Sequence, residues 1–184
     1  MIEVFEDMVA GDMTDTPAIR RKPKVWEIAR ALLQVSRARY GDLELAFFDL
    51  RPSGERSRSE VRRLLTDALQ RLSAAKGGFG ELIADHLRMV AVMSAPRGRV
   101  LFNLRVYICP FDGAERSSGH YLASRLIWAA TTLRLSRDRI AHGLPLDKAR
   151  IDAATKEAQL RFLQQFEGWE EWARALDLTP PFEV

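Results

Sequence analysis

Arginine is the residue type whose spacing in this chain points most directly to chemistry. One group lies at the start of an amphipathic segment near residue 58, and another flanks a Pro-Gly turn near residue 97. A guanidinium binds phosphate oxygens through its charge and through paired N–H donors. The candidate nucleic-acid ligands are therefore Arg56, Arg58, Arg62, Arg63, Arg97 and Arg99.

Arg125 is a separate candidate because it interrupts an apolar segment, with Tyr121 and Trp128 at helical spacing around it. A charge in such a segment needs a partner or a route to water. It could bind an anionic ligand or pair with an acid such as Asp49. We favour a third interpretation, in which the side chain passes the aromatic rings on its way to solvent and gains cation–π stabilisation.

Cys109 could be a nucleophile if Asp112 and His120 lay beside it in the fold. A lone cysteine next to a strand is more often a small core residue, and we favour that interpretation. The single cysteine also excludes an internal disulfide, which points to a cytoplasmic location.

No metal or phosphate-loop motif is present in the sequence. His86, His120 and His142 are far apart and form no HxxxH pair, and the segment Gly77–Gly80 lacks both the Walker spacing and the dinucleotide fingerprint. We therefore expect no catalytic residue, no metal and no cofactor, and the sequence favours a protein that is not an enzyme.

Charge is distributed unevenly along the 184 residues, although the formal net charge is only +3. Residues 1–19 hold five acids and no base, residues 20–105 hold eighteen bases and nine acids, and residues 106–184 hold ten bases and eleven acids. A basic middle behind an acidic leader suits contact with phosphates. A solvated basic face, or a compositional preference for arginine, would give the same pattern.

The elements divide the chain into an acidic, mobile leader over residues 1–22 and one globular domain over 23–184. Apolar residues at helical spacing from Val25 predict a helix that ends at Gly41. Residues 43–50 favour a strand, and the capping box Ser57-x-x-Glu60 predicts a second helix with Val61, Leu64, Leu65, Ala68 and Leu72 on its buried face.

Residues 87–109 contain Pro96-Arg97-Gly98, which predicts a β-hairpin that turns there. Its second strand alternates, and we expect the apolar face from Val100 through Ile108 to lie in the core. Residues 115–178 are predicted to be helical, with helices over 121–135 and 136–142 and another from Asp147. The expected fold class is therefore α+β. A two- or three-stranded antiparallel sheet in the basic part, 23–110, would pack on helices and precede a helical C-terminal half.

The order of helix, short element, helix and hairpin is similar to that of a winged helix, in which a helix enters the major groove of DNA and the hairpin contacts the backbone. The long turn before Ser57 and the segment between Lys76 and Leu87 depart from that pattern.

Three functions remain open. The first is a non-enzymatic nucleic-acid-binding or regulatory protein that contacts DNA or RNA phosphates. The second is a protein-interaction module or homo-oligomer, suggested by Trp169, Trp172, Phe182 and the acidic leader. The third is a small-molecule binder or enzyme that uses Arg125. No apolar run reaches the length of a membrane span and the N-terminus lacks the features of a secretory signal, so no membrane partner is expected.

Overall fold

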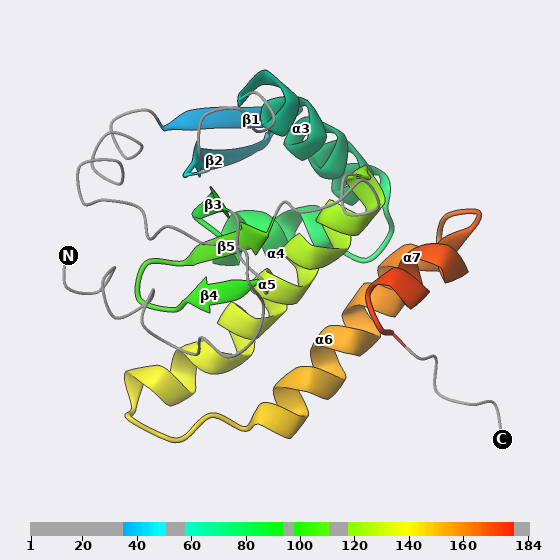
Figure 1. Ribbon diagram of the computed structural model, residues 1–184. Helices are drawn as coiled ribbons and strands as arrows, with labels where there is room; N and C mark the ends of the chain where they lie inside the picture. The colour runs from blue at the N-terminus through cyan, green and yellow to red at the C-terminus, as the bar shows by residue number, and fades with distance from the viewer. Residues whose placement is uncertain (1–34, 51–57, 94–97, 111–117, 179–184) are drawn as a thin grey trace, which may run out of the picture.

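A computed structural model describes residues 35–50, 58–93, 98–110 and 118–178 (Figure 1). The predicted leader and most of the first predicted helix therefore lie outside the described residues. In chain order the elements are β1 Ser36–Tyr40, β2 Leu43–Asp49, α3 Arg58–Ala74, α4 Phe79–His86, β3 Met89–Met93, β4 Arg99–Leu101, β5 Val106–Pro110, α5 Gly119–Ala141, α6 Lys148–Leu163 and α7 Trp169–Ala175.

The sheet is larger than expected and is mixed. Its five strands lie in the order β1-β2-β3-β5-β4. β2, β3 and β5 run parallel to one another, and β1 and β4 are antiparallel edge strands. The protein is α+β, but the expected small antiparallel sheet built on a hairpin is wrong.

The predicted hairpin over residues 87–109 is wrong because its two expected strands pair in parallel. β3 lies beside β5, with Val90 opposite Tyr107. The chain instead reverses within residues 102–105, where Arg105 takes a positive φ of 54° and its N–H donates to the Phe102 carbonyl. Of the predicted turn, Pro96 and Arg97 lie outside the described residues, and Gly98 leads into β4.

The buried face expected for this region, Val100 through Ile108, is also wrong. The reversal exchanges the faces, so Val100 and Tyr107 pack into the main core while Val106 and Ile108 lie on the other side of the sheet. β3 and β5 are apolar at nearly every position because both of their faces are buried, which is usual for central parallel strands.

The helix predicted to end at Gly41 is replaced over its last residues by strand β1. Gly41 lies in the turn between β1 and β2 with a φ of 55°, a conformation that glycine adopts without strain. The strand predicted for residues 43–50 is confirmed as β2. Together β1 and β2 form a hairpin at one edge of the sheet.

Helices α3 and α4 connect β2 to β3, as a parallel pair requires. The expected buried residues of α3, from Val61 to Leu72, are confirmed, and Leu69 joins them. Ser57 of the predicted capping box lies outside the described residues.

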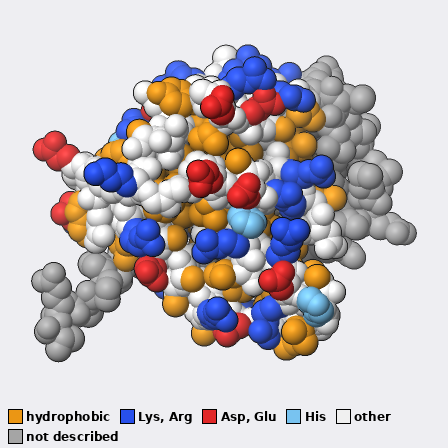
Figure 2. Space-filling model, turned by 180° about the vertical axis from the view of Figure 1, so that it is seen from behind, with side chains coloured by type: hydrophobic (Ala, Val, Ile, Leu, Met, Phe, Trp, Pro, Cys, Tyr) orange, Lys and Arg blue, Asp and Glu red, His pale blue; other side chains and the backbone are white. Residues whose placement is uncertain are grey.

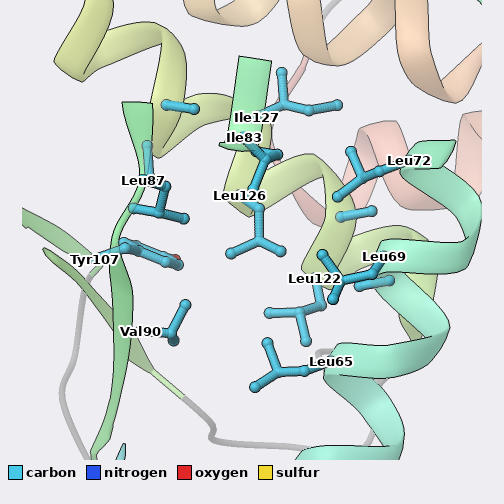
Figure 3. Close-up of a cluster of buried hydrophobic side chains, with 14 of the residues drawn as sticks. Leu65, Leu69, Leu72, Ile83, Leu87, Val90, Tyr107, Leu122, Leu126 and Ile127 are labelled. Carbon is cyan, nitrogen blue, oxygen red and sulfur yellow. The ribbon is translucent and has the colours of Figure 1, made fainter. Parts of the chain in front are cut away.

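The main core lies between one face of the sheet and helices α3, α4 and α5. Figure 3 shows side chains from the strand side facing those from the helices: Leu87, Val90 and Tyr107 on one side, and Leu65, Leu69, Leu72, Ile83, Leu122, Leu126 and Ile127 on the other. A smaller cluster of Phe48, Ala91, Val106 and Ile108 occupies the opposite face. Its members in the described part of the chain come from strands and their flanking residues.

Helix α5 is one continuous helix of 23 residues rather than the two that were expected. Its central residues are buried nearly all round, because it packs on the core on one side and on α6 on the other (Figure 1). Within the described ranges, no helix combines the length and apolar character needed to cross a membrane.

A buried polar contact joins α5 to α6. The Gln159 amide donates to the Ser124 carbonyl at 3.2 Å and to the Ser124 hydroxyl at 3.1 Å. Gln159→Leu should lower the free energy of unfolding by about 1–3 kcal/mol, because it leaves the buried Ser124 hydroxyl without this partner. Denaturant unfolding measures the loss.

The control is the double variant Gln159→Leu with Ser124→Ala. Removing both polar partners should restore part of the lost stability, as expected for a coupled pair. Losses that simply add would contradict the contact.

Candidate functional site

The predicted arginines of α3 lie together on its exposed face. Arg58, Arg62 and Arg63 are solvent-exposed within the first two turns of the helix. Arg56, in the segment before the helix, lies outside the described residues. This part of the predicted site is therefore one exposed basic stretch on a single helix.

Arg99 lies elsewhere on the molecule. It opens β4 at the edge of the sheet opposite β1, the strand against which α3 packs. Four strand spacings separate these edges, which is about 19 Å. Because the neighbouring Val100 faces the helices, the Arg99 side chain lies on the other face of the sheet. The structure thus does not join Arg99 to the arginines of α3, and Arg97 lies outside the described residues.

A second basic group, which sequence reasoning missed, surrounds His86 and is called here the His86 cluster. It consists of His86 at the end of α4, Arg105 just before β5, and Arg134 and Arg137 on α5. Arg88, just before β3, joins it because its backbone N–H donates to the Arg105 carbonyl. These residues are up to 51 positions apart in the sequence, so only the parallel pairing of β3 with β5 and the return of α5 bring them together.

Arg105 has a structural role in the His86 cluster. Its Nε donates to the His86 carbonyl at 3.0 Å, and its Nη2 donates to the Asp85 carbonyl. A cation at this position satisfies carbonyls at the end of α4 that lack helical partners. Its charge also interacts favourably with the negative, C-terminal end of the helix dipole. Arg88, Arg134 and Arg137 are exposed, and within the described ranges none of them forms an ion pair with an acid.

The pKa of His86 reflects the charges that surround its imidazole. Burial lowers the pKa of the His86 imidazole most, and Arg134, Arg105 and Arg137 lower it further. Asp85 acts in the opposite direction. Figure 2, the view from behind, shows Lys and Arg side chains over much of that face with single acidic side chains among them. On the face that Figure 2 shows, the basic side chains therefore form local groups rather than one continuous stripe.

A third polar group joins α3, α5 and α7 around His120. Arg71 Nη1 lies 2.6 Å from His120 Nε2, and Arg71 also forms an ion pair with Asp67. The imidazole stacks on Trp172 with 3.8 Å between ring centroids and meets the edge of Phe166. Gly119 allows this packing, because a Cβ there would lie 1.9 Å from Asp67 Oδ2.

The contact with Arg71 makes His120 unsuitable as a general base for Cys109. Burial, followed by the charge of Arg71, lowers the pKa of His120 to about 4. The Arg71 donor already occupies Nε2, and the Cys109 thiol is buried, with its Sγ donating to the Pro110 carbonyl at 3.6 Å. Asp112 lies outside the described residues. A group of three His, Cys, Asp or Glu side chains suited to a metal is not found within the described ranges.

Arg125 makes the aromatic contact that the sequence suggested. Its guanidinium carbon lies 4.7 Å from the Trp128 ring centroid, and its Nε donates to the Tyr107 hydroxyl at 3.2 Å. The side chain is half-buried. Tyr107, which sequence reasoning did not connect with Arg125, is thus a partner that only the fold reveals.

The tryptophans that suggested a partner surface are packed against the main core. Trp169 and Trp172 are half-buried there, and Trp172 also stacks on His120. Phe182 lies outside the described residues. The described part of the chain therefore does not present these tryptophans as an open apolar patch.

Comparison of this chain with protein families, with curated proteins and with solved structures finds no match. The functional interpretation therefore depends on the residues and geometry of this chain.

The His120 contact predicts a pH dependence of stability. The folded pKa of about 4 lies below the ordinary value of 6.5, so the unfolded chain binds more protons between these values. The stabilising contribution is present above the ordinary pKa and is lost as the pH falls through the folded one. We expect a loss of about 1 kcal/mol, since solvent screens this half-buried group.

Urea unfolding across this pH range measures the effect. His120→Gln keeps a hydrogen-bond acceptor but does not titrate, so the difference between wild type and this variant should shrink as the pH falls. The exposed His142, replaced as His142→Gln, is the control. A difference that does not change with pH would refute the contribution of His120.

Proposed function

We propose that this protein binds nucleic acid without catalysing a reaction and contacts phosphates through the His86 cluster. The observation that carries this proposal is the convergence of Arg134 and Arg137 of α5 on His86 and Arg105, with Arg88 just before β3. None of the exposed arginines, Arg88, Arg134 and Arg137, pairs with an acid in the described part of the chain. Like charges held close together repel one another, and a polyanion relieves that repulsion.

The geometry favours contact with the phosphate backbone over reading of base sequence. The arginines lie just before β3 and in the C-terminal half of α5. None of these arginines lies at the N-terminus of a described helix, the end that reads bases when a recognition helix enters the major groove of DNA. Phosphate contacts position a protein on nucleic acid without specifying sequence. Binding should therefore be similar across sequences and should weaken steeply with salt.

Fluorescence anisotropy with a labelled DNA duplex and a labelled single-stranded RNA tests the proposal. Arg134→Ala with Arg137→Ala should weaken binding and reduce the slope of log K against log salt by about 0.9 for each duplex phosphate that the variant no longer neutralises. In the wild-type complex the pKa of His86 should rise, because phosphates offset the neighbouring guanidinium charges.

Two matched pairs serve as controls. Arg161→Ala with Arg174→Ala removes two exposed charges from α6 and α7 and should leave the slope almost unchanged. Arg62→Ala with Arg63→Ala tests the arginines of α3. A larger loss for the α3 pair than for the α5 pair would reject the His86 cluster as the contact surface, and no salt-dependent binding by the wild type would reject the function.

A further inference from the structure

Arg125 is held in one orientation by partners that do not neutralise its charge. Nε donates to the Tyr107 hydroxyl, and the guanidinium lies over the Trp128 ring. Tyr107 is fully buried, and burial raises the pKa of its hydroxyl, so this acceptor stays uncharged. The aromatic ring is also uncharged. The arginine is thus ordered and half-buried, and it is not part of a salt bridge with any described acid.

Most of the donors of Arg125 have no acceptor among the described residues. A guanidinium carries five N–H groups, and only the one on Nε has an acceptor among the described residues. A half-buried cation has lost part of its hydration, and its N–H groups then favour an anionic acceptor. The remaining N–H groups of Arg125 lie in one plane, a geometry that matches two oxygens of a carboxylate or phosphate.

The backbone at Gly98 lies against the Arg125 guanidinium. A Cβ at this position would lie 2.7 Å from Arg125 Nη2 and 2.8 Å from the Tyr107 hydroxyl oxygen. Both distances are shorter than any normal contact. Any larger residue would therefore push the guanidinium away, whereas glycine lets the backbone pass close to it.

Gly98, and with it the Arg125 guanidinium, lies toward the carboxyl ends of the parallel strands. β2, β3 and β5 are parallel and end on one edge, at Asp49, Met93 and Pro110. Gly98 lies toward this edge, because it precedes Arg99, which pairs with Ile108, the middle residue of β5.

We propose that Arg125 binds a small oxyanion, a carboxylate or phosphate group of a small molecule, at the carboxyl edge of the parallel strands. Arg125 contacts the anion through Nη1 and Nη2. Tyr107 and Trp128 are positioning residues that hold the guanidinium, and the absence of a side chain at Gly98 lets it keep that position. This site differs from the His86 cluster in both its residues and its ligand, so each can fail without the other.

Titration of the native protein with inorganic phosphate and, separately, with malonate tests the proposal, followed by the NMR signal of Arg125 Nε–Hε. We expect a saturable shift with at least one of the two, and the stronger ligand identifies the phosphate or carboxylate class. No saturable shift with either anion up to roughly 50 mM, which corresponds to a negligible affinity, overturns the proposal.

Three variants then separate direct contact from structural effects. Arg125→Lys should weaken binding at least tenfold, since lysine lacks the planar pair of donors. Gly98→Ala should weaken it at least tenfold while leaving the charge in place. Tyr107→Phe should weaken it several-fold and broaden the Nε–Hε signal, because the side chain loses its fixed orientation.

Arg134→Ala with Arg137→Ala is the matched control, since it removes two arginines from the same helix. It should leave the Arg125 shift unchanged. If this control loses the shift, or if Gly98→Ala retains full affinity in a folded protein, Arg125 is not the anion site. The titration of the native protein tests anion binding without any variant. The proposal can therefore be rejected even if one of the variants does not fold.

Discussion

Burial of helix α5 against the sheet is the constraint on which every polar cluster depends. Leu126, Ile127 and Ala130 of this helix are fully buried. Burying a leucine or isoleucine side chain contributes about 1.5–3 kcal/mol, so these positions fix how the helix is turned. A shift by one residue would rotate it by about 100° and bring charged residues into the core. The same packing fixes which neighbouring elements His120, Arg125 and Arg134 face.

The charges along α5 meet three different environments as a result. At its start, neutral His120 faces an arginine that is already paired with an acid. In its second turn, Arg125 has only neutral partners among the described residues. In its last turns, Arg134 and Arg137 face further positive charge around His86. From the start of α5 to its end, the described residues offset less of the positive charge beside the helix. We expect anions to bind where the least of that charge is offset.

Local pattern predicted the helices better than the sheet. The buried residues of α3 could be read from spacing, because a helix expresses its period within a few turns. The pairing of β3 with β5 could not, because alternation continued through the reversal at residues 102–105 and mimicked one long strand. The apolar runs in β3 and β5 were the available signal for buried parallel strands. For the same reason, Arg58, Arg62 and Arg63 could be placed together, whereas the His86 cluster could not.

The position of α5 on β5 is the central claim, and nuclear Overhauser contacts between aromatic rings test it most directly. The Tyr107 and Trp128 ring centroids lie 6.0 Å apart, and those of His120 and Trp172 lie 3.8 Å apart. We predict cross-peaks for both ring pairs in one spectrum of the native protein. A spectrum in which the Trp128 ring contacts other side chains but not Tyr107 would contradict this position, and with it the placement of Arg125.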